Sequence, residues 1–195
     1  MELRPVGWTL GAGFDVELND NAEWFLTGYR VGAAFDVSID RSKIFWARFR
    51  AWYSASTGTV ENGEKLATLD SWDIGIGILA GLRLYESGEQ SISLFAGYGL
   101  GFGMMDVQTT EKGEEKWDPD CPTFAEVMED PKQIKCWIEG MDGSFTSGKF
   151  LAEVAIDFGP LTATPFYEYS MNNTKRGRVM SDHLHKVGMM VGFEF

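Results

Sequence analysis

The sequence lacks any long apolar run. No stretch of about 18 consecutive uncharged apolar residues, the length that a transmembrane helix needs, occurs in its 195 residues. This excludes a membrane protein built of helices. Basic residues are also scarce, since 17 Lys and Arg stand against 29 Asp and Glu, for a net charge of −12. A nucleic acid partner needs clustered Lys and Arg on one face, so none is expected.

Residues that carry metal or redox chemistry are few. The chain has 2 cysteines and 2 histidines, and its acidic loop residues do not follow the spacing of a calcium-binding loop. Cys121 and Cys136 would need two further zinc ligands, yet His183 and His185 belong to another segment. We therefore expect no metal and no cofactor.

What the sequence does contain is eight segments in which apolar and polar residues alternate. In residues 72–84 every second side chain is apolar, and the apolar face of none of the eight segments carries a charge. This is the period of a β-strand with different surroundings on its two faces. A tilted membrane strand needs about 9–11 residues with aromatic residues near the interfaces, and the segments meet this requirement.

The opposite faces of these segments carry charges of both signs, separated by glycines. Lipid outside and ion pairs inside a narrow lumen account for this pattern. Bulky Trp46 and Trp52 against glycines of neighbouring strands favour a plugged lumen, while a polar passage between the glycines is the alternative. The predicted lumen charge network comprises Asp15, Arg30, Arg48, Arg50, Asp73, Arg83, Glu153 and Glu168.

Turn lengths predict the topology. Residues 40–42, 86–90 and 159–160 form short hairpin connections, whereas 19–23, 57–71, 106–148 and 172–185 form longer loops. The expected fold is an all-β, eight-stranded antiparallel up-and-down transmembrane barrel, formed as one domain by residues 1–195. The short turns and both termini would be periplasmic and the long loops extracellular. Pro165 cannot donate to a ladder and predicts a bulge or a later start of its strand.

The chain resembles the small eight-stranded outer-membrane barrels of the OmpA, OmpX and opacity-protein type. The resemblance rests on the strand number, the loop asymmetry and the final segment 187–195, which ends on an aromatic residue after alternating apolar positions. It implies that the barrel-assembly machinery reads this last strand, with Phe193 and Phe195 as the signal. Residues 1–5 contain no signal peptide, so we expect a mature form of an exported protein.

The long loop 106–148 is the expected contact element. Cys121 and Cys136 lie fifteen positions apart in it, and an oxidising medium predicts a disulfide between them. Phe124 and Trp137 are the candidate contacts for a protein partner. In the last long loop a basic group, Lys175, Arg176 and Arg178, is a candidate site for lipopolysaccharide phosphates, the alternative being a solvated loop tip.

Enzyme activity is not expected. Lipid A deacylases use Ser, His and an acid on such barrels, but Ser181, Asp182, His183 and His185 match no family motif. Ser181 and His183 are also too close along one strand to face each other. We expect a non-enzymatic membrane anchor and cell-surface interaction or structural protein, alone or as the membrane subunit of an envelope assembly. The alternative is a small pore or a conduit for small or apolar solutes.

Overall fold

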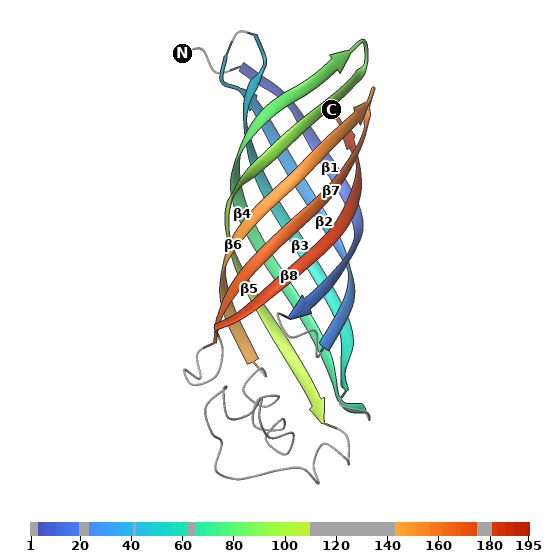
Figure 1. Ribbon diagram of the computed structural model, residues 1–195, viewed down its shortest axis with the longest axis vertical. Coiled ribbons are helices and arrows are strands. Elements are labelled where there is room, and N and C mark those ends of the chain that lie inside the picture. The colour runs from blue at the N-terminus through green and yellow to red at the C-terminus, as the bar shows by residue number, and fades with distance from the viewer. Residues whose placement is uncertain (1–3, 20–23, 41, 62–64, 110–142, 175–180) are drawn as a thin grey trace.

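The computed structural model describes residues 4–19, 24–40, 42–61, 65–109, 143–174 and 181–195. In these residues eight antiparallel strands form one closed barrel in sequence order (Figure 1). The predicted fold class is confirmed. The strands are β1 (Arg4–Asn19), β2 (Trp24–Ser38), β3 (Phe45–Glu61), β4 (Lys65–Ser87), β5 (Gln90–Thr109), β6 (Gly143–Phe158), β7 (Leu161–Thr174) and β8 (Ser181–Glu194).

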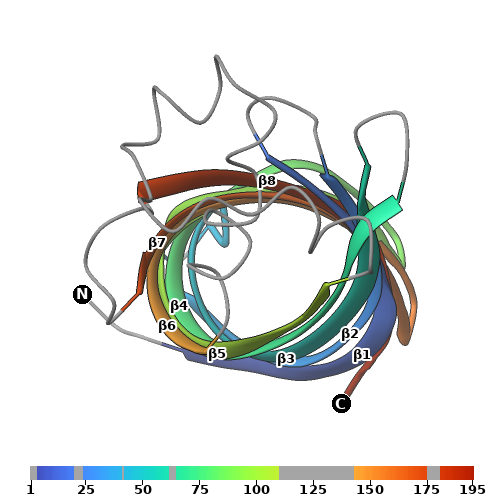
Figure 2. The same cartoon turned by 90° about the horizontal axis from the view of Figure 1, so that it is seen from below.

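The barrel closes by pairing of its first and last strands. β1 runs antiparallel to β8 from Thr9 opposite Glu194 to Asn19 opposite Leu184, which completes the ring seen from below in Figure 2. Where all eight strands lie side by side, closure leaves no free edge, so the backbone amides and carbonyls of this part of the wall pair with one another. Hydrocarbon requires this of any backbone that spans a membrane.

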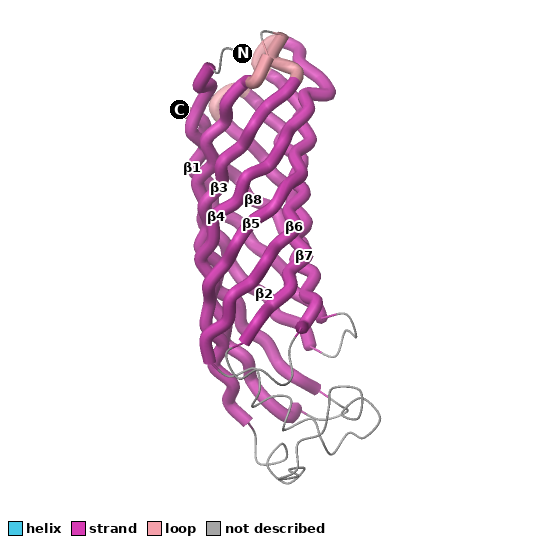
Figure 3. The backbone as a smooth tube through the Cα atoms, turned by 90° about the vertical axis from the view of Figure 1, so that its left-hand side faces the viewer, coloured by secondary structure: helices cyan, strands magenta, loops and turns pink. Residues whose placement is uncertain are grey.

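The short turns, the start of β1 and the end of β8 lie at one end of the barrel (Figure 1). We call this the turn end and the opposite end the loop end. Gly88 and Gly159 occupy the left-handed region, with φ of 61° and 62°, in the turns β4–β5 and β6–β7. Toward the loop end, the strands reach well past the bounds that the sequence predicted, and β4 and β5 span 23 and 20 residues (Figure 3).

The two faces of the wall divide as the alternation predicts. Outward side chains are apolar and exposed, for example Ile76 and Leu100 at 67% and Tyr98 at 60%. Inward side chains are buried and mostly polar or small, and they include the fully buried Arg30 and Glu168. A water-soluble barrel has the reverse arrangement, so this wall is built to face hydrocarbon.

Two local predictions were wrong. Pro165 causes no bulge, and β7 begins at Leu161; the β6–β7 ladder keeps its register, and only the pairs between Glu153–Phe166 and Ile156–Ala163 are missing. The missing donor of proline interrupts the ladder without shifting it. In β4, by contrast, a register shift between Arg83 and Tyr85 turns Tyr85 outward, where it is 51% exposed, although the alternation of residues 72–84, continued by one residue, predicts that it faces the lumen.

Candidate functional site: the charged lumen

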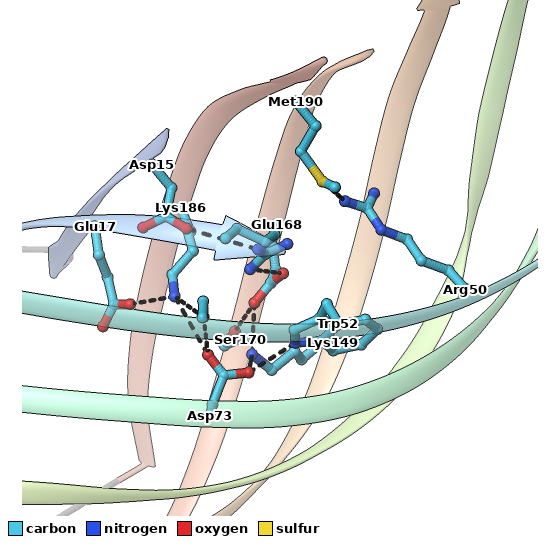
Figure 4. Close-up of polar contacts among 12 residues, drawn as sticks. Asp15, Glu17, Arg50, Trp52, Asp73, Lys149, Glu168, Ser170, Lys186 and Met190 are labelled. Carbon is cyan, nitrogen blue, oxygen red and sulfur yellow. Dashed lines mark hydrogen bonds and ion pairs between the residues drawn. The ribbon is translucent and has the colours of Figure 1, made fainter. Parts of the chain in front are cut away.

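The lumen holds two groups of charged side chains. The group nearer the loop end comes from six strands, and we call it the loop-side cluster (Figure 4). Its members are all at most 5% exposed, and all are charged. They are Asp15 and Glu17 of β1, Arg30 of β2, Asp73 of β4, Lys149 of β6, Glu168 of β7 and Lys186 of β8.

Asp73 is the centre of the loop-side cluster. One carboxylate oxygen accepts hydrogen bonds from Lys149 Nζ at 2.7 Å and from the indole Nε1 of Trp52 at 2.8 Å. The other accepts a bond from the Ser54 hydroxyl at 2.5 Å and lies 3.4 Å from Lys186 Nζ. A buried carboxylate is stable as an anion only when it is paired and hydrogen-bonded in this way.

Glu168 forms the second centre of the loop-side cluster. Its two oxygens lie 2.8 Å from Arg30 Nη2 and 2.6 Å from Lys149 Nζ, so Lys149 bridges both centres. Arg30 Nε lies 3.6 Å from Asp15, at ion-pair distance. Lys186 likewise bridges Asp73 to Glu17, 2.9 Å away. The ion pairs thus form one continuous network across the lumen (Figure 4).

The turn-side cluster consists of Asp36, Arg48, Arg50 and Glu153. Arg48 binds Asp36 through Nε and Nη2, at 2.8 and 2.7 Å, and reaches Glu153 with Nη1 at 3.2 Å. Arg50 pairs with the other oxygen of Glu153 and donates to Met190 Sδ at 2.7 Å. The two-pronged contact with Asp36 is the strong, geometrically specific form of an arginine–carboxylate pair.

Large side chains fill the space between the charges. A side-chain carbon at Gly99 would lie 2.9 Å from the Trp52 ring, and one at Gly77 would lie 2.7 Å from Leu151, so these glycines make room for large inward side chains. The Arg48 guanidinium lies 3.9 Å from the centre of the Phe95 ring. Glycine and bulk are therefore complementary, as the sequence predicts. The apolar core of the lumen consists of Trp46, Trp52, Leu79, Phe95, Leu151 and Ala155.

A polar vestibule of about 150 Å³ opens at the turn end. Trp46, Phe95 and Arg48 line it together with the rim carboxylates Asp157 and Glu194. A separate cavity of about 30 Å³, lined by Arg48, Arg50 and Glu153, lies farther into the lumen beside the turn-side cluster.

Arg83 stands apart from the other residues predicted to form the lumen network. It lies at the turn-end rim, pairs with Glu86 at 3.1 Å and covers the ring of Trp46. Sequence reasoning also missed Lys149 and Lys186, because both lie just before the predicted starts of their strands. Extending the alternation of residues 150–158 and 187–195 backward by one residue would have found them. The structure brings together Asp15, Arg30, Asp73 and Glu168 in one cluster and Arg48, Arg50 and Glu153 in the other.

The residues weighed as a catalytic group do not lie in a loop. β8 begins at Ser181, which pairs with Asn173, and His183 pairs with Met171, so the predicted loop 172–185 is shorter than expected. The His185 ring lies on the outer wall, where its Nδ1 is 2.7 Å from the Tyr167 hydroxyl. Among the described residues, no group of three or more His, Cys, Asp or Glu is arranged to hold a metal ion.

Several predicted contact residues lie outside the described part of the chain. They are Cys121, Phe124, Cys136 and Trp137 of the third long loop and Lys175, Arg176 and Arg178 of the last. Phe193 and Phe195, predicted to form the assembly signal, face outward at 55% and 76% exposure. Within the described ranges no helix is long and apolar enough to cross a membrane.

The fold is similar to those of solved outer-membrane barrels. Neisserial surface protein A aligns over 100% of both chains with a TM-score of 0.53 and 10% identity. The chain has the fold of the small eight-stranded outer-membrane barrels. Ail, the attachment invasion locus protein of Yersinia pestis, solved with the heparin analogue sucrose octasulfate, aligns over 97% of this chain and 99% of its own, with a TM-score of 0.49 and 11% identity. No family model and no curated protein matches the sequence.

Proposed function

We propose that the protein is a non-conducting barrel of the bacterial outer membrane that anchors its extracellular loops at the cell surface. The observation that carries this proposal is the filled lumen. A network of buried ion pairs spans it on the loop side, and Trp52, Phe95 and Leu151 occupy the space beside the charges. A wall facing lipid with a plugged interior leaves the loops as the surface available for interaction.

The positions of the short turns and of the long connections indicate how the barrel is oriented in the membrane. The short turns, the start of β1 and the end of β8 lie at one end, as periplasmic turns do in such barrels, and the strand ends that the long connections join lie at the other. We infer that the loop end faces the cell exterior. The exposed Phe193 and Phe195 at the end of the last strand are accessible to the assembly machinery during insertion.

Binding of lipopolysaccharide by the basic group of the last loop is a direct test of a cell-surface role for the loop end. Lipopolysaccharide is the probe, and it is added to refolded protein in phospholipid vesicles. Replacing Lys175, Arg176 and Arg178 together by Gln should weaken lipopolysaccharide binding and reduce its dependence on salt, because phosphate pairing is screened by ions. Arg83→Gln, at the opposite end, is the matched control and should bind normally. Equal binding by all three proteins would contradict a loop-end phosphate site.

A protein partner at the third loop is tested separately. Phe124→Ala with Trp137→Ala should abolish partner binding at the cell surface while the resistance of the barrel to unfolding stays unchanged. Binding that survives both changes would show that this loop is not the contact surface. Breaking the predicted Cys121–Cys136 disulfide with Ser at both positions should weaken the same binding by loosening the loop.

The competing function, a pore for small solutes, is tested by swelling of vesicles that contain the protein. We expect vesicles in solutions of small sugars to swell no faster than protein-free vesicles. Swelling that falls off with sugar size would favour the pore.

A further inference from the structure

The outer wall of the barrel carries an apolar groove that extends from β1 to β5. Its volume is about 710 Å³, and its lining side chains are almost all apolar. The floor consists of Ala33 and Ala51, which stand directly opposite each other on β2 and β3. Flanking them on the wall are Ile76 and Leu100, the next positions in the same row across β4 and β5.

A ridge of aromatic rings bounds the groove toward the turn end. Trp8 and Phe35 lie with ring centres 4.6 Å apart, and Phe35 and Phe49 with centres 6.5 Å apart. The three residues occupy one register row across β1, β2 and β3, two residues from the alanine row. A row of large rings beside a row of methyl groups creates the hollow. A second depression of about 430 Å³ shares Ala51 and extends the hollow toward Tyr53.

We propose that this groove binds one acyl chain of a phospholipid of the periplasmic leaflet. The inference rests on the membrane location under the proposed function. The groove lies in the wall that faces hydrocarbon, so a lipid chain is the molecule present there at high concentration. A rigid concave surface with aromatic walls contacts more of a chain than the flat wall does, because dispersion contacts increase with the surface enclosed.

The turn between β2 and β3 supplies a partner for the lipid headgroup. Lys43 is exposed on this turn, and the Trp46 indole fixes the turn by donating to the Lys43 carbonyl at 2.7 Å. Ala51 of the floor follows Phe45, the first residue of β3, by six residues, which is about 20 Å along a strand and about 14 Å in depth at a 45° tilt. One leaflet of the hydrocarbon core is about 15 Å deep. A phosphate beside Lys43, just beyond the start of β3, is therefore about one leaflet depth above the floor of the groove.

The test uses vesicles of phosphatidylethanolamine and phosphatidylglycerol that contain phosphatidylglycerol spin-labelled near the chain end. Electron paramagnetic resonance then counts the slowly exchanging lipids on each barrel. Ala51→Phe fills the groove, and Ala96→Phe adds the same ring to an outward alanine of β5 outside it. We expect wild type and Ala96→Phe to hold about one slowly exchanging lipid more than Ala51→Phe. Lys43→Gln should weaken retention of the anionic lipid several-fold.

Equal counts in the wild type and both phenylalanine variants would overturn the proposal. So would sedimentation that gives a dimer for the wild type and a monomer for Ala51→Phe, because a second copy would then occupy the groove. Far-ultraviolet circular dichroism and protease resistance in the same vesicles establish that each variant is folded and inserted. Failure of the wild type to insert would instead contradict the proposed membrane function.

Discussion

The loop-side and turn-side clusters both pair charges that are buried in the lumen, but their ion pairs are arranged differently. The loop-side cluster draws its seven charges from six strands around the barrel, and each of its central carboxylates is shared by two cations. The turn-side cluster is built on two neighbouring strands, where Arg48 stands opposite Asp36, with Glu153 reaching across from β6. The first joins six strands through shared carboxylates, whereas the second joins the neighbouring strands β2 and β3 to a single residue of β6.

This difference predicts that one lost charge has a larger effect in the loop-side cluster. Both pairs of Glu168 are fully or almost fully buried, so Glu168→Gln leaves Arg30 and Lys149 short of a counter-charge. We expect a loss of about 3–5 kcal/mol in the free energy of unfolding. Urea unfolding in lipid vesicles, followed by tryptophan fluorescence, measures it. Arg83→Ala at the rim is the control, and a loss as large there would contradict the account.

Asp36→Asn probes the local pair of the turn-side cluster. Arg48 keeps its contact with Glu153, and the Asp36 side chain is 17% exposed, so water replaces part of the lost interaction. We expect a loss of about 1–2 kcal/mol, smaller than that of Glu168→Gln in the same unfolding assay. An equal loss of unfolding free energy in the two variants, or a larger loss for Asp36→Asn, would contradict the proposed difference between the clusters.

Trp52→Phe sharpens the comparison, because it removes one donor from Asp73 while both lysines remain. The ring still fills most of the space over the glycines. The loss should be about 1 kcal/mol, the usual contribution of one hydrogen bond. A loss near that of Glu168→Gln would mean that packing of the indole, rather than charge, dominates the loop-side cluster.

The smallest expected effect is on the pH dependence of stability, through Asp40 in the β2–β3 turn. The Ser42 hydroxyl and the Phe45 backbone N–H donate to Asp40 and hold the pKa of its carboxyl below the usual range. Asp40 therefore contributes stability that is complete above its unfolded-state pKa and is lost as the pH falls through its folded-state pKa. Asp40→Asn should slightly reduce the stability lost between neutral pH and about pH 3. An unchanged pH profile would contradict these hydrogen bonds.

Alternation along the sequence predicted the eight strands and the side of the wall on which the charges within the predicted segments lie, and turn lengths predicted the topology. Lys149 and Lys186 were missed because β6 and β8 begin earlier than the alternation indicated. Alternation also predicted that glycines face large rings, because a narrow lumen has room for a large ring only where the facing residue is small. It could not predict which charges meet. Arg30 and Glu168 are 138 positions apart and touch only because the barrel closes with a particular stagger. The outward turn of Tyr85 was equally hidden, because a bulge breaks the two-residue period without a residue type that announces it.

The central claim is that ion-paired side chains close the lumen, and ion conductance in a planar bilayer tests it most directly. The refolded wild type is measured beside Arg48→Ala and Arg50→Ala, which remove cations from the turn-side cluster. The account predicts no channels from the folded wild-type barrel. Regular wild-type channels that widen in the two variants would contradict it, and would show a water-filled lumen controlled by these arginines.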